Sequence, residues 1–221
     1  MTQDTGLRSH VFWLYGVIVG LAIKEGLSEV LPHLFTKSVQ PFYHLLEGAR
    51  LLVFLILIIR FYLGAVKFFS DAYDCVEAGS SYTSKNYFID FLIGFFHFLF
   101  FFALAISIDI HDRPLWLYPV LLAGILVYDV PWLAVNWYND TYHLIKLWTF
   151  VNVGTLLVGA CLYLTLPNMG VSTAKAEASA LLIVLIVSLI DIGEIVTDKE
   201  IFATGLKRLT SRTPDPPISA P

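Results

Sequence analysis

The sequence predicts an all-α protein that crosses a membrane several times. Of its 221 residues, 57% are hydrophobic and only 14% are charged, and the mean hydropathy is +0.72. Soluble domains carry about 25% charged residues, so this composition cannot supply a water-facing surface. Apolar runs such as 51–59 do not alternate with polar residues as the strands of a membrane barrel do. Helices are therefore expected.

The chain divides into about six apolar segments, each close to the roughly 20 residues that cross a bilayer core. We expect spans over Val11–Leu31, Leu45–Phe69, Tyr87–Ile108, Leu115–Val135, Leu144–Leu166 and Ala178–Thr197. Short connections leave no room for a separate soluble domain. Residues 1–198 are therefore predicted to form one six-helix transmembrane domain.

Lys and Arg are distributed unevenly over the connections. One predicted side holds Arg8, Lys67, Lys85, Lys146, Lys199, Lys207, Arg208 and Arg212, and the other holds Lys37, Arg50, Arg113 and Lys175. Because the richer side is normally cytoplasmic, both termini are predicted to be cytoplasmic. The expected location is a plasma or inner membrane.

Two segments outside the spans have a distinct character. Residues 199–221 combine a short amphipathic stretch, suited to an anionic lipid surface, with a proline-rich end that cannot be helical. The connection 70–86 carries Asp71, Asp74 and Glu77. It is either a solvated loop or a surface that docks a cytoplasmic partner.

Several ionisable residues fall inside the predicted spans, where each costs about 2.5–3.5 kcal/mol on insertion scales. Arg60, Asp129, Asp191 and Glu194 all map to the cytoplasmic half, and Asp90 begins the third span on that side. One interpretation is that Arg60 pairs with Asp129 or Asp191 to lock the bundle. The other is that the carboxylates in excess over Arg60 form a proton or cation site.

Polar residues on the third and fifth spans extend this set. His97 shares a helical face with Asp90 and Gly94, so it is either a proton relay or a neutral histidine bonded to a neighbouring helix. Asn152 belongs to a polar and small stripe with Trp148. Such stripes face the bundle interior.

A second group lies at the far end of the first span. Lys24 follows Gly16 and Gly20 at intervals of four, and Glu25 is adjacent. If the glycines mark a close helix contact, Lys24 turns inward to meet a carboxylate. Lys24 and Glu25 are therefore included as pathway candidates.

Evidence for a metal, a cofactor or nucleic acid is weak. Imidazoles and carboxylates gather in the non-cytoplasmic connections without a recognisable metal-binding motif: His33, His44, Asp109, His111 and Asp112. A bis-histidine haem lacks a second histidine at mid-depth, and no cofactor is expected. A net charge of -4 argues against nucleic acid.

These patterns leave three functional hypotheses. The first is a small ion channel or proton-coupled transporter that works as a homo-oligomer in the lipid bilayer. The second is a membrane anchor or sensor-effector that docks a cytoplasmic protein. The third is an intramembrane enzyme that acts on a lipid or quinone with His97 or the carboxylates as acid and base, although catalytic motifs such as HExxH are lacking.

Overall fold

The computed structural model describes residues 4–34, 41–77, 84–137 and 142–197. Within these ranges the chain is helical except for short connections such as 107–116, and it contains no strand. The elements are α1 (Asp4–Leu34), α2 (Pro41–Glu77), α3 (Ser84–Ile106), α4 (Leu117–Val127), α5 (Asp129–Val135), α6 (Tyr142–Thr165), the 3-10 turn η1 (Leu166–Met169) and α7 (Thr173–Thr197). The predicted fold class is confirmed.

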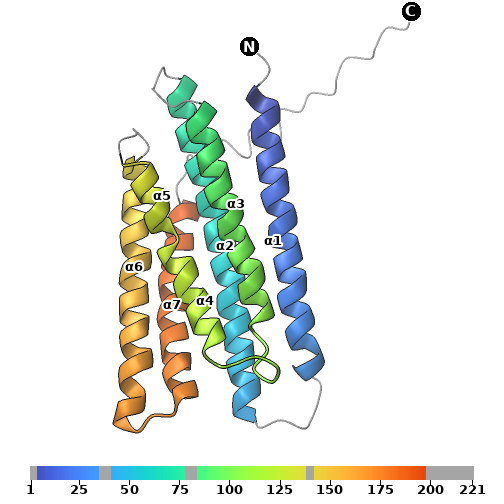
Figure 1. Ribbon diagram of the computed structural model, residues 1–221, viewed down its shortest axis with the longest axis vertical. Helices are drawn as coiled ribbons and strands as arrows, with labels where there is room; N and C mark the ends of the chain where they lie inside the picture. Colours follow the sequence, from blue (N-terminus) through green and yellow to red (C-terminus); the bar gives the residue numbers. More distant parts are fainter. Residues whose placement is uncertain (1–3, 35–40, 78–83, 138–141, 198–221) are drawn as a thin grey trace, which may run out of the picture.

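The helices form an elongated bundle with their long axes side by side (Figure 1). Helix α2 lies at its centre, in contact with α1, α3 and α7, while α6 packs against α4, α5 and α7. Five spans are long and apolar enough to cross a membrane: Tyr43–Phe69, Phe88–Ile106, Leu117–Val135, Ile145–Met169 and Thr173–Thr197. With the 31-residue α1, they agree with the expected number of about six.

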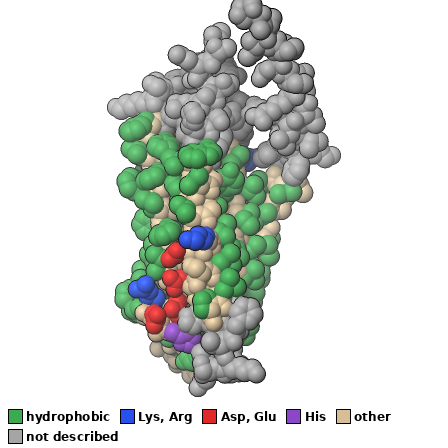
Figure 2. Space-filling model, turned by 90° about the vertical axis from the view of Figure 1, so that its right-hand side faces the viewer, with side chains coloured by type: hydrophobic (Ala, Val, Ile, Leu, Met, Phe, Trp, Pro, Cys, Tyr) green, Lys and Arg blue, Asp and Glu red, His purple; other side chains and the backbone are tan. Residues whose placement is uncertain are grey.

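The surface of the bundle is what a lipid environment favours. On α6 the side chains of Leu147, Leu157 and Leu164 are 65–70% exposed, and the outer faces of α1 and α3 likewise present apolar residues (Figure 2). Contiguous apolar surface on this scale would be unusual on a soluble monomer. The protein is therefore integral to a membrane.

Helix boundaries depart from the predicted ones for local reasons. Pro131 has no N–H to donate to the carbonyl of Val127, and the fourth span is interrupted between α4 and α5, where the N–H of Tyr128 bonds to the carbonyl of Ile125 (3.3 Å). At the end of η1, Gly170 adopts φ 84°, a left-handed conformation that favours glycine. This turn leads the chain into α7, which begins before the predicted Ala178.

Two segments that the sequence singled out, 199–221 and 70–86, lie wholly or partly outside the described residues. Residues 198–221 include the amphipathic stretch and the proline-rich end. In the connection 70–86, α2 continues to Glu77 and α3 starts at Ser84, so Asp71, Asp74 and Glu77 belong to the last turns of α2. The structure does not describe the side chains of these three residues.

Candidate functional site

A buried ion pair joins α2 to α7. Arg60 is completely buried, and its Nε donates to Oδ2 of Asp191 at 2.5 Å. The indole Nε1 of Trp148, on α6, donates to the same oxygen at 2.5 Å. This confirms that Arg60 has a carboxylate partner on the last span, and it adds Trp148, which the sequence placed only on an interior stripe.

Trp148 reaches Asp191 because α2 leaves space for its ring at Gly64. A Cβ at Gly64 would lie 1.5 Å from Cη2 of Trp148, so any side chain there would overlap with the indole. Cζ of Arg60 also lies 5.8 Å from the centroid of the Trp148 ring, within the range of a cation–π contact. The position of Asp191 is thus set from two helices.

Asp129 brings a second carboxylate to the same place. It is fully buried at the start of α5, and the amide of Asn152 on α6 donates to its Oδ2. The charges of Arg60 and Asp191 both act on it. A second buried carboxylate therefore lies near the ion pair of Arg60 and Asp191. We call Arg60, Asp129, Trp148, Asn152 and Asp191 the Arg60 layer.

The Arg60 layer holds more hydrogen-bonding capacity than its own contacts satisfy. Five buried polar atoms here bond to no described residue: Nη1 and Nη2 of Arg60, Oδ1 of Asp129, Oδ1 of Asn152, and Oγ of Ser188, which lies one turn before Asp191. Buried polar atoms are normally paired, often through ordered water. Donors and acceptors of this kind on four helices are suited to a hydrated polar centre.

Asp90 occupies a separate position between α3 and α5. It is 1% exposed, and its Oδ1 accepts from Nε1 of Trp132 (2.7 Å) and Nδ2 of Asn136 (2.9 Å). The polar residues of the fourth span therefore have two partners, since Trp132 and Asn136 bind Asp90 while Asp129 binds Asn152. Asp90 fastens α3 to α5.

His97 packs among aromatic rings on the same helix as Asp90. Its ring centroid lies 4.7 Å from that of Phe61 and 4.8 Å from that of Tyr128, and the backbone of Ile125 is nearby. Gly94, the third member of the predicted face, instead makes room for the hydroxyl of Tyr15 on α1. This packing matches a histidine held by a neighbouring helix, and a relay role is left as a prediction.

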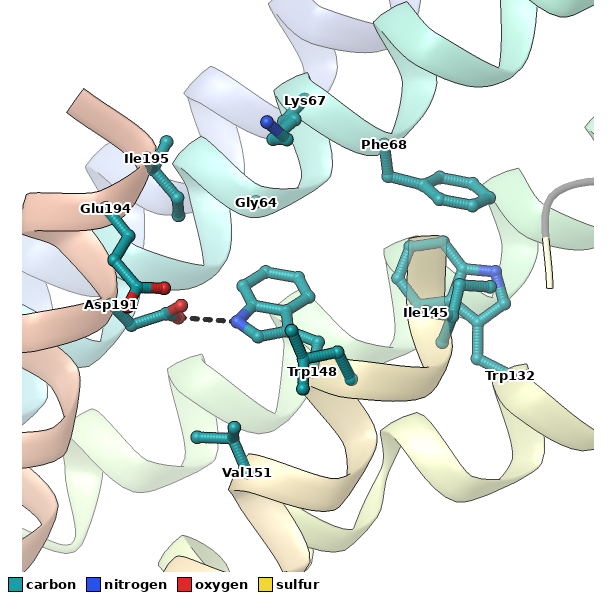
Figure 3. A pocket seen from close by; sticks show the side chains of 11 residues that line it. Gly64, Lys67, Phe68, Trp132, Ile145, Trp148, Val151, Asp191, Glu194 and Ile195 are labelled. Atoms are coloured by element: carbon teal, nitrogen blue, oxygen red, sulfur yellow. Dashed lines mark hydrogen bonds between the residues drawn. The ribbon is translucent and has the colours of Figure 1, made fainter. Parts of the chain in front are cut away.

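A pocket of about 350 Å³ opens beside the Arg60 layer. Figure 3 shows the carboxylates of Asp191 and Glu194 on the side of the pocket that faces the Trp148 ring. The pocket lies between α2, α5, α6 and α7 and is lined by Gly64, Lys67, Phe68, Trp132, Ile145, Leu147, Trp148, Val151, Asp191, Glu194 and Ile195. Asp191 thus connects a buried ionic centre to a space that can hold a ligand.

The prediction that Gly16 and Gly20 mark a close helix contact and turn Lys24 inward is wrong within a single chain. Lys24 is exposed and Glu25 is partly exposed, and a Cβ at Gly16 or Gly20 would meet no described atom within 4 Å. The buried face of α1 instead runs through Tyr15, Ile18, Ala22, Gly26 and Val30. On the α1 side of the molecule, charged side chains interrupt an otherwise apolar surface (Figure 2).

A second buried ion pair was missed because Arg50 was assigned to a connection. Arg50 is fully buried in α2, with Nε 2.6 Å from Oε1 of Glu177 and Nη2 3.0 Å from Oε2. Arg50 also donates to the carbonyls of Ser107 and Leu115. The bidentate pair therefore holds the α3–α4 connection against α2 and α7.

Glu47, one turn from Arg50, is also completely buried. Its Oε1 accepts from the N–H of Ile110 (3.3 Å), and its carboxylate oxygens lie 3.8 Å from Nδ1 of His44 and 3.6 Å from Nε2 of His111. We call Glu47, Arg50 and Glu177 the Arg50 layer. One signal in the sequence could have revealed the Arg50–Glu177 pair. Arg50 near the start of the second span and Glu177 next to the start of the sixth are expected at the same depth in the membrane.

The histidines and carboxylates of this end do not form a metal site in the part of the chain that the structure describes. No group of three or more His, Cys, Asp or Glu side chains there is arranged to hold a metal ion. The side chain of His33 lies outside the described set.

The comparisons with known proteins give no family for this chain. Neither a family model, nor a curated protein, nor a solved structure matches it. Functional inference therefore depends on the geometry described above.

Proposed function

We propose that the protein is a proton-coupled membrane transporter, in which the Arg60 layer binds the proton and the adjacent pocket binds the solute. The observation that carries this proposal is a second buried carboxylate, Asp129, which lies within reach of the charges of the Arg60–Asp191 ion pair. Only Asp191 also lines the pocket. A proton site and a solute site would therefore have one residue in common.

The charge balance explains why a proton belongs there. With Asp129 and Asp191 both ionised, one negative charge would be left uncompensated beside Arg60, and an unpaired buried charge is strongly disfavoured. Asp191 accepts two hydrogen bonds, one of them from the Arg60 guanidinium, so it is the carboxylate expected to stay ionised. Asp129 has only an amide donor, so it is the natural carrier of the proton.

The distribution of polar groups favours a carrier over an open channel. The Arg60 and Arg50 layers are ten residues apart on α2, about 15 Å at the rise of a helix. Between them α2 turns only apolar side chains to the core, including Val53, Phe54 and Leu57. The buried polar side chains Thr155 and Ser188 stay within one turn of Asn152 and Asp191. A continuous aqueous pore would need polar or open space at that depth, whereas a carrier opens each side in turn.

The proposal also assigns a direction. The Lys and Arg distribution puts the Arg60 layer in the cytoplasmic half, so its pocket would exchange solute with the cytoplasmic side. The Arg50 layer would then close the opposite side.

A pH jump on proteoliposomes tests the proposal without knowledge of the solute. Proton binding to a buried carboxylate moves charge across part of the membrane dielectric, so a step in pH should give a transient current on a solid-supported sensor. We expect this transient for the unmodified protein and its loss in Asp129→Asn. Asp191→Asn should reduce it as well.

Glu25 was a pathway candidate from the sequence, but it is partly exposed on α1, a helix that contributes no residue to the Arg60 layer or to the pocket. Glu25→Gln therefore provides the matched control. It should leave the transient unchanged. The proposal fails if the unmodified protein gives no transient between about pH 5 and 9, the range within which perturbed carboxylates titrate. An equal transient in Asp129→Asn, with protein correctly inserted, would also refute it.

A further inference from the structure

The pocket beside Asp191 combines carboxylates with aromatic rings. We propose that it binds a small organic ammonium ion, and that this ion is the transported solute. The identification of the ion as the solute rests on the proposed transport function, whereas the binding itself does not. The proposal depends on which pocket groups are available to a ligand, on the chemistry of the walls and on the local charge.

Two carboxylates offer acceptor atoms to the pocket. Arg60 and Trp148 both bond to Oδ2 of Asp191, and the Asp191 side chain stays 16% exposed, so it reaches the pocket surface. Glu194 is exposed one turn further along α7 and forms none of the ion pairs found among the described residues. An ammonium ion could lie against both.

The rest of the wall suits the carbon part of such an ion. Trp148, Trp132 and Phe68 contribute rings, and Ile145, Val151 and Ile195 contribute aliphatic groups. The faces of Trp rings attract cations, and quaternary ammonium ions are the usual ligands of aromatic cages. Aromatic rings beside carboxylates favour an organic cation over a bare metal ion, which requires converging oxygen ligands.

The local charge favours a cation over an anion. The guanidinium of Arg60 is completely buried and its Nε faces Asp191, so an anion in the pocket would meet that carboxylate and Glu194 first. Lys67 also lines the pocket, so the charged side chains on its wall are two carboxylates and one ammonium group. A volume of about 350 Å³ falls within the usual range for small-molecule sites.

Coupling to protons follows from the same charge balance. A bound ammonium ion and a proton on Asp129 both compensate the negative charge of the Arg60 layer. When the cation binds, the proton is less favoured, and it should leave to solvent. Binding is therefore expected to release protons.

The test is isothermal titration of the purified full chain in nanodiscs with benzyltrimethylammonium, and with phenylmethanesulfonate as an anion of similar size and shape. We expect binding of the cation alone. Glu194→Gln should weaken it by roughly tenfold, as the loss of one charge from a partly desolvated pair implies. Trp148→Phe should weaken it by roughly three- to thirtyfold, the range of a cation–π contact.

Glu25→Gln again serves as the control and should bind as the unmodified protein does. Equal binding of the sulfonate, or unchanged cation binding in Glu194→Gln, would overturn the assignment. The measurement is made at equilibrium without a gradient, so its failure would leave the pH-jump result untouched. Loss of the pH-jump transient alone would refute proton coupling and leave the cation site in place.

Discussion

Replacing Gly64 by alanine tests how the Arg60 layer is assembled. The new Cβ would lie 1.5 Å from Cη2, 2.1 Å from Cζ2 and 2.4 Å from Cζ3 of Trp148. Real Cβ contacts are never this short, so the indole must move away. Because the same ring donates from Nε1 to Asp191 and lines the pocket, its displacement should break that hydrogen bond and change the shape of the pocket.

The expected cost can be estimated from its parts. Overpacking a filled site costs about 1–3 kcal/mol, and an interhelical hydrogen bond in a membrane contributes about 0.6–1.7 kcal/mol. Alanine recovers about 1 kcal/mol of helix propensity over glycine. The free energy of unfolding should therefore fall by about 1–4 kcal/mol, with steric overlap as the larger cause.

Equilibrium unfolding in mixed micelles, followed by tryptophan fluorescence, measures this loss. Gly20→Ala is the matched control, because its Cβ would meet no described atom within 4 Å. Adding Trp148→Leu to Gly64→Ala should recover most of the loss due to overlap, since the ring that clashes is gone. If Gly64→Ala is as stable as Gly20→Ala and has the same fluorescence, this account of the site is refuted.

Three further substitutions probe other contacts, each by thermal unfolding in detergent. Glu177→Gln removes the carboxylate that is ion-paired with the buried Arg50 and should cost about 3–5 kcal/mol; the double change of Arg50 and Glu177 to apolar residues of similar size should cost less. Gly94→Ala puts a Cβ 2.3 Å from the hydroxyl of Tyr15, and should cost about 1–3 kcal/mol by overpacking. Asp90→Asn weakens acceptance from an indole and an amide and should cost about 1–3 kcal/mol. Values near zero in any of the three would contradict the contact concerned.

The sequence predicted the fold and one part of the site for physical reasons. Long apolar segments can only be buried in lipid as helices, which gave the number of spans. Arg60 lies within an uninterrupted apolar run, so it required a carboxylate at the same depth, and Asp191 is that partner. Neither inference needed any knowledge of how the helices pack.

Other features depended on packing that periodicity does not encode. Arg50 lies close to the predicted start of its span, where hydropathy cannot distinguish a buried charge from an interfacial one. On α1 two stripes of small residues compete, and the sequence alone did not show that Ala22 rather than Gly20 faces the core. The role of Trp148 depends on the space at Gly64, on another helix.

Infrared spectroscopy of the purified protein tests the central claim most directly, because a protonated carboxyl group has its own C=O stretching band. In a difference spectrum between neutral and alkaline pH, we predict loss of such a band from the unmodified protein. That signal should be absent from Asp129→Asn, while the control Glu25→Gln should retain it. An unmodified protein with no protonated carboxyl band, or an undiminished band in Asp129→Asn, would contradict the assignment of the proton to the Arg60 layer.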